Sequence, residues 1–169
     1  LSVLEQIEAK VKEMEIANRP EPTGVVVFKA DDLQQTTYDS TVTEGDFTLV
    51  ATSDKKMDKK SKVVRFSYDG ENYTTAYGLS MGGSAKFGTS RYISFTVDGP
   101  CSVTIAVQSS GTDTRTLNMV NSAGQNVGSF EAPSAVMVST VDIDAAGTYS
   151  VGSAGSGMYV YMIIIEYFE

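Results

Sequence analysis

A run of lysines between residues 53 and 62 is the first group of side chains that could do chemistry. The run holds five of the thirteen basic residues of a chain whose net charge is −8: Lys55, Lys56, Lys59, Lys60 and Lys62. Amines gathered in this way attract anions such as carboxylates, if the fold turns them to one side. The alternative is a solvated hairpin loop, because runs of charge often simply face water.

Tyrosines supply the second kind of binding chemistry. Neutral sugars are held by aromatic rings that lie flat against the C–H faces of a pyranose, while polar side chains contact the hydroxyls. The chain has no tryptophan, so such a platform must be tyrosine or phenylalanine. Tyr77 stands beside the glycine-rich segment 78–84, predicted to be a loop, where its ring can be exposed. Tyr92 is either a rim residue of the site or an ordinary strand residue.

Acidic residues that occur close together could bind calcium. They are Asp31 with Asp32, Asp69 with Glu71, and Asp142 with Asp144. None has the spacing of an EF-hand loop, and turns select aspartate for backbone reasons alone. The sequence therefore predicts no cofactor, with structural calcium as the alternative.

Several functional classes are disfavoured by what the sequence lacks. There is no histidine and one cysteine, Cys101, so the Ser-His and Cys-His arrangements and most zinc sites are absent. No acidic pair stands out for glycoside hydrolysis, and segment 78–84 lacks the Gly-Lys-Ser/Thr of a phosphate loop. The acidic charge argues against nucleic acid, and no apolar window reaches the ~18 residues of a membrane helix. We expect a protein that is not an enzyme.

The elements that must position these side chains are strands. Fifteen glycines and many short segments of alternating apolar residues predict an all-β, antiparallel, jelly-roll-like β-sandwich. Residues 91–97 and 101–107 are predicted to be adjacent paired strands, each with one buried face. Residues 148–151 are expected to pair with 158–168, which are apolar on both alternations. That last strand is predicted to be central, its second face covered by loops or by the N-terminal helix.

The N-terminal segment has a different pattern. Leu4, Ile7, Val11 and Met14 recur at helical spacing, which predicts a short amphipathic α-helix. It is either a linker helix, lying on the domain or continuing from an upstream module, or a short coiled-coil contact. Residues 20–24 then end the helix. The predicted units are a helix and linker, 1–19, and a β-sandwich domain, 20–169.

An ordered set of short motifs resembles a known family. The motifs are Asp69-Gly70, a two-residue hairpin signal, then Tyr73-Thr74, Gly82-Gly83, the 91–97 strand with Gly99-Pro100, residues 114–117 with 121–124, residues 147–151 and residues 157–161. Together, over residues 25–168, they resemble the β-sandwich carbohydrate-binding modules attached to bacterial pectate lyases and other enzymes that degrade plant cell walls, the pectin-binding modules.

The resemblance implies a non-catalytic module that targets a parent protein to plant cell-wall polysaccharide, either pectin (homogalacturonan) or a β-glycan. It also implies an extracellular or cell-surface location and a monomer within a larger multimodular protein. In the pectin-binding members, Arg and Lys before the Gly-Gly help to meet carboxylates; the matching positions here are the uncharged Gly78 and Ser80. Lys86 could substitute, and Arg91 and Arg115 match basic positions of the family at strand starts.

Combining both kinds of chemistry gives one predicted site for a polysaccharide. Its members are Tyr77, Ser80, Lys86, Arg91, Tyr92, Arg115, Lys56 and Lys60. An ionic site would weaken with salt, whereas an aromatic platform would respond much less. The alternative function is a structural or adhesive cell-surface module that binds protein or host glycan, since a fold does not fix a function.

Overall fold

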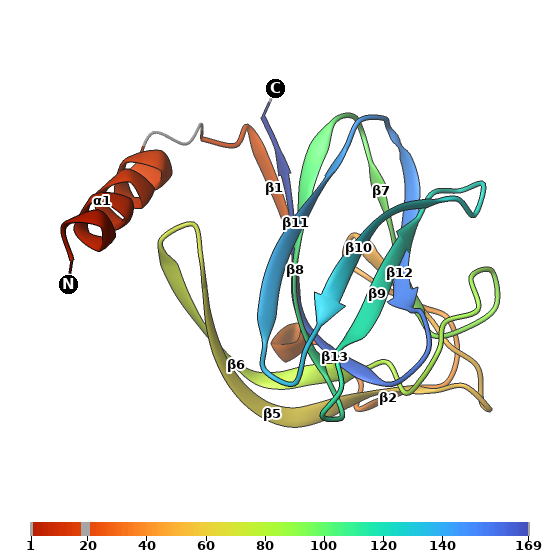
Figure 1. Cartoon of the computed structure of the whole chain (residues 1–169). Helices are drawn as coiled ribbons and strands as arrows, with labels where there is room; N and C mark the ends of the chain where they lie inside the picture. The colour runs from red at the N-terminus through yellow and green to blue at the C-terminus, as the bar shows by residue number, and fades with distance from the viewer. Residues whose placement is uncertain (1, 18–20, 169) are drawn as a thin grey trace.

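Two antiparallel β-sheets stacked face to face form the sandwich, and one helix lies outside it (Figure 1). The computed structural model describes residues 2–17 and 21–168. The strands of the seven-stranded sheet are, in spatial order, β11 (Met137–Ile143), β8 (Cys101–Ser109), β13 (Met158–Tyr167), β6 (Glu71–Ser80), β5 (Met57–Tyr68) and β2 (Thr37–Tyr38), with β1 (Gly24–Lys29) beside β13. Those of the six-stranded sheet are β10 (Asn126–Ala132), β9 (Arg115–Val120), β12 (Gly147–Ser153), β7 (Tyr92–Val97), β4 (Phe47–Val50) and β3 (Val42–Glu44). The predicted β-sandwich is confirmed.

The core lies between the sheets, where the strands of both point their apolar side chains. Burial alternates along β4 and β7, so that Phe47, Leu49, Ile93 and Phe95 are buried while their neighbours are more exposed. Alternation follows from strand geometry, because successive side chains point to opposite faces. The ring of Phe47 lies 5.4 Å from that of Phe28 and 5.9 Å from that of Phe95, which ties β1, β4 and β7 together.

The strands β7 and β8 follow each other in the chain but belong to different sheets. β7 lies between β4 and β12, whereas β8 lies between β11 and β13. The prediction that they pair is therefore wrong, and so is the predicted pairing of residues 148–151 with 158–168. Alternation shows which face of a strand is buried but not which strand lies next to it. The prediction of one buried face also fails for β8, where Thr104, Ile105 and Ala106 are all buried.

The lysine run is largely a strand. β4 and β5 lie in different sheets, so residues 53–62 do not form a hairpin loop, and that interpretation is wrong. β5 begins at Met57, which is fully buried, and Lys59, Lys60 and Lys62 follow on the strand itself. A strand with one wet face accepts charges at alternate positions.

The hairpin predicted at Asp69-Gly70 joins β5 to β6. Tyr68 pairs with Glu71, and the two turn residues have φ angles of 53° and 78°, as a type I′ turn requires. The hairpin is long, and in Figure 1 it curls away from the edge of the sheet.

That curl covers the second face of β13. β13 has β8 on one side and β1 with β6 on the other, which confirms the central position predicted for it. On the face away from the main core, Tyr161 and Ile164 form a second apolar cluster with Phe66 and Tyr73 of the hairpin. The cover is thus the β5–β6 hairpin, rather than loops or the N-terminal helix.

The predicted N-terminal helix is present as α1 (Val3–Ala17). It stands apart from the sandwich in Figure 1, and its described side chains, from Val3 to Lys12, are exposed. The interpretation in which α1 lies against the domain is wrong for these residues. Residues 1, 18–20 and 169 lie outside the described residues, and so does the predicted boundary between units 1–19 and 20–169. Within the part of the chain that is described, no helix has the length and hydropathy of a membrane span.

Replacing Gly78 with alanine is expected to lower the free energy of unfolding by about 1–3 kcal/mol, as overpacking does. A Cβ on Gly78 would lie 2.7 Å from Cε1 of Tyr161, whose ring is fully buried and has no room to move. Gly155→Ala is the matched control, because nothing lies within 4 Å of its added Cβ. Denaturant unfolding of both variants measures the effect; equal stabilities would contradict tight packing of Tyr161 beneath β6.

Candidate functional site

One end of the sandwich is built from loops 51–56, 81–91, 110–114 and 154–157, here called the loop end. These loops meet because β4, β6, β8 and β12 end where β5, β7, β9 and β13 begin; for example, Ser80 pairs with Tyr159, and Val50 with Tyr92. The predicted site residues that lie at or beside the loop end are Lys56, Lys86, Arg91, Tyr92 and Arg115.

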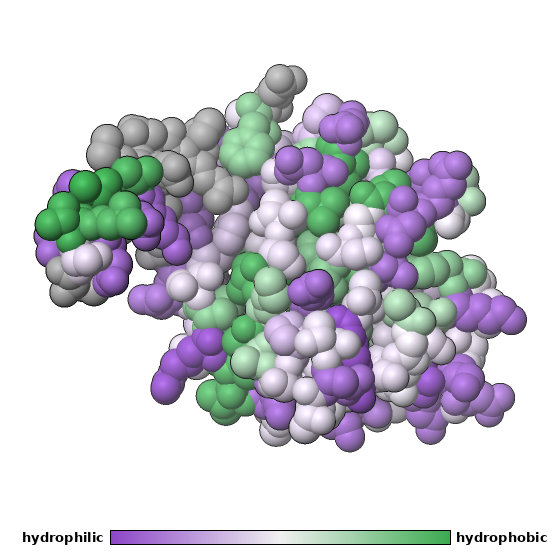
Figure 2. Space-filling model, viewed as in Figure 1, coloured by the Kyte–Doolittle hydropathy of each residue, from purple (hydrophilic) through white to green (hydrophobic). Residues whose placement is uncertain are grey.

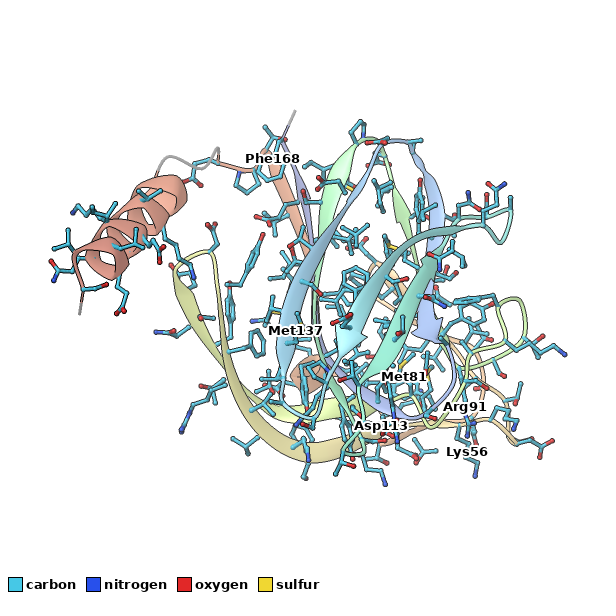
Figure 3. The ribbon with its side chains drawn as sticks, in the orientation of Figure 1. Lys56, Met81, Arg91, Asp113, Met137 and Phe168 are labelled. Carbon is cyan, nitrogen blue, oxygen red and sulfur yellow. The ribbon has the colours of Figure 1, made fainter. Side chains whose placement is uncertain are left out.

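Arg91 lies across the two glycines of the loop end. Its backbone is left-handed, with φ of 62°, and its Nε donates to the carbonyl oxygen of Lys56 at 3.3 Å. A Cβ on Gly82 would lie 3.1 Å from Nη2, and one on Gly83 would lie 2.8 Å from Nη1. Figure 3 shows Lys56 and Arg91 near each other at this end. Among the described residues, no carboxylate forms an ion pair with Arg91 or Lys56, so both cations are available to an anion.

Arg115 uses its guanidinium within the protein. Its side chain is 20% exposed, and its Nη2 lies 3.0 Å from Oδ1 of Asp113. Its Nη1 donates to Oγ of Ser110 at 2.9 Å and to the carbonyl oxygen of Gly157 at 2.6 Å. The hydrogen bond from Arg115 lowers the pKa of Asp113. These partners make Arg115 a clamp between loops 110–114 and 154–157, and its predicted contact with ligand stays a prediction.

Lys86 and Tyr92 belong to the 81–91 loop and the strand that follows it. Backbone hydrogen bonds of 3.0 Å between Lys86 and Ser90, one in each direction, close a narrow tip that exposes the lysine. The ring of Tyr92 lies 5.6 Å from that of Phe87 and so supports the tip. Lys86 can reach a ligand at the loop end, while Tyr92 contributes packing.

Tyr77 is 36% exposed, as predicted, but a lysine lies over one face of its ring. It lies in β6 rather than in a loop, and Nζ of Lys59 lies 4.4 Å from its ring centroid. The same Nζ donates to the carbonyl oxygens of Asp31 and Leu33, at 3.1 and 2.9 Å. Oδ1 of Asp31 in turn accepts the backbone N–H groups of Ala76 and Tyr77. This lock fastens the 3₁₀ turn η1 (Ala30–Asp32) to β5 and β6 and covers one face of the ring.

A second surface lies next to the loop end, on the outer face of the seven-stranded sheet. We call it the sheet face; its members are Lys60, Lys62, Ser80, Gln108 and Tyr159. Gln108, Tyr159 and Ser80 are directly paired on three adjacent strands, so their side chains form a row about 5 Å apart. All three are partly exposed. The row offers an amide, an aromatic ring and a hydroxyl, which are groups that contact sugars.

The two lysines of the sheet face stand beside this row. Lys60 is paired with Gly78, and Gly78 packs against Tyr161 and the Cβ of Tyr159, which places Lys60 on the same face. Nζ of Lys62 lies 5.1 Å from the ring centroid of Tyr159. The register of β5 shifts between residues 61 and 64, and such a bulge re-aims the side chains that it carries.

The sheet face is held in place from below. The ring of Tyr159 lies 6.3 Å from that of the buried Tyr161, at 29°. The hydroxyl of Tyr161 donates to Oε1 of Gln108 at 2.5 Å, and Nε2 of Gln108 donates to the carbonyl oxygen of Ser134 at 2.8 Å. Burial raises the pKa of Tyr161 well above its usual range, so this phenol stays a proton donor. The amide of Gln108 is therefore fixed in orientation.

The structure thus divides the predicted residues between two neighbouring surfaces. Lys60 and Ser80 lie on the sheet face, and Lys56, Lys86 and Arg91 lie at the loop end. Sequence reasoning missed Gln108 and Tyr159, and it named Lys62 only as a member of the lysine run. The spacing of Lys60 and Lys62, two residues apart, was a usable signal once the segment is taken as a strand. Within the described residues, no three His, Cys, Asp or Glu side chains gather as a metal site would need.

Comparisons with known proteins give similarity of fold. No protein-family model and no curated protein matches the sequence. The structure is similar to one from work on the Ruminococcus flavefaciens cellulosome that describes an expansion in glycan recognition. The TM-score is 0.53 at 17% identity, and the match covers 88% of this chain and 97% of that chain.

Other structural neighbours are carbohydrate-binding modules. A family 35 module from Clostridium thermocellum aligns with a TM-score of 0.40 at 13% identity, over 85% of this chain and 98% of that one. The C-terminal family 6 module of a laminarinase from Zobellia galactanivorans aligns with a TM-score of 0.38 at 14% identity, over 85% and 99%. At such identities, likeness is evidence for the fold and not for a ligand.

Removing the Lys59 lock is expected to destabilise the fold. Lys59→Met takes away two hydrogen bonds from a charged donor and leaves two carbonyl oxygens without it, which should cost about 1–3 kcal/mol. Lys60→Met, on the next residue, is the control and should leave the unfolding free energy within about 0.5 kcal/mol. Calorimetric or denaturant unfolding distinguishes the two; a stable Lys59→Met variant would mean that the lock contributes little.

Proposed function

We propose that this chain is a non-catalytic glycan-binding module that attaches a larger, multimodular protein to polysaccharide outside the cell. The observation that carries the proposal is the position of Lys60 and Lys62 beside the ring of Tyr159, on an open sheet face bordered by Ser80 and Gln108. The similarity of fold to a structure described in terms of glycan recognition supports it.

The ligand that fits the sheet face best is a polymer of uronic acids, such as the homogalacturonan of pectin. Ammonium groups bind carboxylates through charge-assisted hydrogen bonds, and no carboxylate of the described residues is ion-paired with Lys60 or Lys62. The tyrosine ring can carry the C–H face of one sugar while the lysines meet carboxylates. A neutral β-glycan would depend on the ring and the row of polar groups instead.

The loop end extends the basic surface. Lys56 precedes β5 by one residue, and Arg91 is bound to the carbonyl of Lys56. A polymer that follows β5 from Lys60 towards the loop end would pass Asp58 and then reach Lys56, with Arg91 beside it. Arg91 is suited to a carboxylate because its planar guanidinium presents paired donors.

Among the described residues, this surface carries one carboxylate rather than a facing pair. The carboxylate belongs to Asp58, which pairs with Ser80 and accepts a hydrogen bond from the hydroxyl of Thr37 at 3.0 Å. Glycoside hydrolysis uses two facing carboxyl groups. Binding is therefore the role that we assign.

Loss of the sheet-face lysines should weaken binding to polygalacturonate. In affinity gels, the double variant Lys60→Ala with Lys62→Ala is expected to raise the dissociation constant by about tenfold or more, since each charge-assisted contact contributes roughly 1.5–3 kcal/mol. Salt should weaken retention of the parent chain as well. Lys12→Ala, on exposed α1, is the control. Retention that is unchanged by both high salt and the double variant would exclude the ionic site.

Alanine substitutions of the individual tyrosines are expected to reduce glycan binding to different extents. Tyr159→Ala should lose most retention, on acidic and neutral glycans alike, whereas Tyr159→Phe should keep it because the ring remains. Tyr77→Ala should bind as the parent does, because Tyr77 lies three residues before Ser80 on β6 and its side chain is therefore on the opposite face of the strand. Melting temperatures show whether each variant is folded. If none of homogalacturonan, xylan, xyloglucan and β-glucan retards the parent chain in the gel, a structural or adhesive module is favoured.

A further inference from the structure

One face of α1 consists of apolar side chains that the sandwich leaves uncovered. Val3, Leu4, Ile7 and Val11 are 73, 64, 54 and 47% exposed. Figure 2 shows a green, apolar band along the helix. Single exposed apolar residues are ordinary, but a continuous stripe at spacings of three and four along a helix is a contact surface.

A helix of this length needs a partner to be stable. α1 has fifteen residues, and isolated helices of about 12–15 residues are marginal in water. Its start is well formed, because Oγ of Ser2 accepts the backbone N–H of Glu5 at 3.1 Å, and Glu5 lies in the first turn. A capped helix with an uncovered apolar stripe is completed by packing against another surface.

We propose that this surface is α1 of a second copy of the chain, in a parallel two-stranded coiled coil. Leu4 and Val11 take the a positions of a heptad, Ile7 takes d, and Met14 follows at the next d in the sequence. Alternating spacings of three and four keep such residues on the seam between two helices.

Charge selects a like copy and the parallel orientation. Lys10 falls at g, and Glu15 falls at e of the next heptad. In a parallel pair, position g of each helix faces the following e position of the other, so the sequence sets a lysine position against a glutamate position twice. In an antiparallel pair, g faces g and e faces e, so the sequence sets like charges against each other. The sequence therefore favours parallel helices.

Parallel pairing would carry two sandwiches on one stem. This consequence rests on the proposed glycan binding: two modules on one polymer bind with an avidity above that of either module, because the second contact is intramolecular. The dimer replaces the monomer that the resemblance implied, and it is testable without any ligand.

The first experiment measures association of the 169-residue chain by sedimentation equilibrium over a range of concentrations. A reversible monomer–dimer equilibrium is expected, and Ile7→Glu should weaken it at least about tenfold, since it places a charge in an apolar seam. Ala9→Glu, at the outward f position, is the matched control and should dimerise as the parent does. A parent chain that is monomeric throughout, or a dimer that Ile7→Glu leaves intact, overturns the proposal.

Disulfide cross-linking tests the orientation. Leu4→Cys places two thiols opposite each other only in a parallel pair, and oxidation should give a covalent dimer. Cys101 does not interfere, because it is buried and burial raises the pKa of its thiol to about 11. A covalent dimer that forms only when Leu4→Cys is mixed with Met14→Cys would overturn the parallel arrangement.

Ligand binding then separates the two proposals. Ile7→Glu should retain the affinity of the parent for a short oligogalacturonate and lose retention on the polymer by about 10²-fold, the lower range for avidity. If the parent dimerises but binds neither ligand, the proposed function fails while the dimer stands. If short and long ligands respond equally to Ile7→Glu, the two modules do not act together.

Discussion

Burial of β13 on both faces is the constraint on which the rest of the structure depends. One face closes the main core, and the other requires a cover that a two-layer sandwich does not supply. The long β5–β6 hairpin provides it by curling over Tyr161, Met162 and Ile164. This requires a glycine at position 78, where the ring of Tyr161 leaves no room for a side chain. The same curl holds the outward lysines of β5 beside Tyr159, so packing and candidate site arise from one arrangement.

Basic residues in this molecule fall into two groups, which differ in the groups that they contact. Lys59 donates to backbone carbonyl oxygens, and Arg115 donates to a backbone carbonyl oxygen and to the side chains of Ser110 and Asp113. Both residues therefore hold segments of the chain together. Lys60 and Lys62, one and three residues further along, face solvent or an aromatic ring. Neighbours in sequence therefore have opposite roles, because a strand sends them to opposite sides.

The sequence allowed the sandwich, the Asp69-Gly70 hairpin, the N-terminal helix and the central position of the last strand to be predicted. These depend on local signals such as alternation, turn residues and helical spacing. The pairing of β7 with β12 and of β8 with β13 could not be predicted, since partners distant in the chain are chosen by the stacking of whole sheets. The candidate site could be predicted only in part, for the same reason. Lys60 and Arg91 could be named from charge, but Gln108 and Tyr159 become neighbours only through β8 and β13. Tyr77 showed the converse, because the sequence gives no sign that Lys59 lies over it.

The two cations of the sheet face are carried by a strand rather than by a loop: Lys60 is paired with Gly78, and Lys62 lies in the bulge that follows. The positions of their Cα atoms are thus fixed before any polymer arrives, so little backbone entropy would be lost when one docks. Binding would therefore be strongest for a polymer whose carboxylates repeat at a spacing that matches Lys60 and Lys62. A polymer of equal charge density but different repeat would meet the two amines out of phase, so the module would discriminate by periodicity as well as by sign.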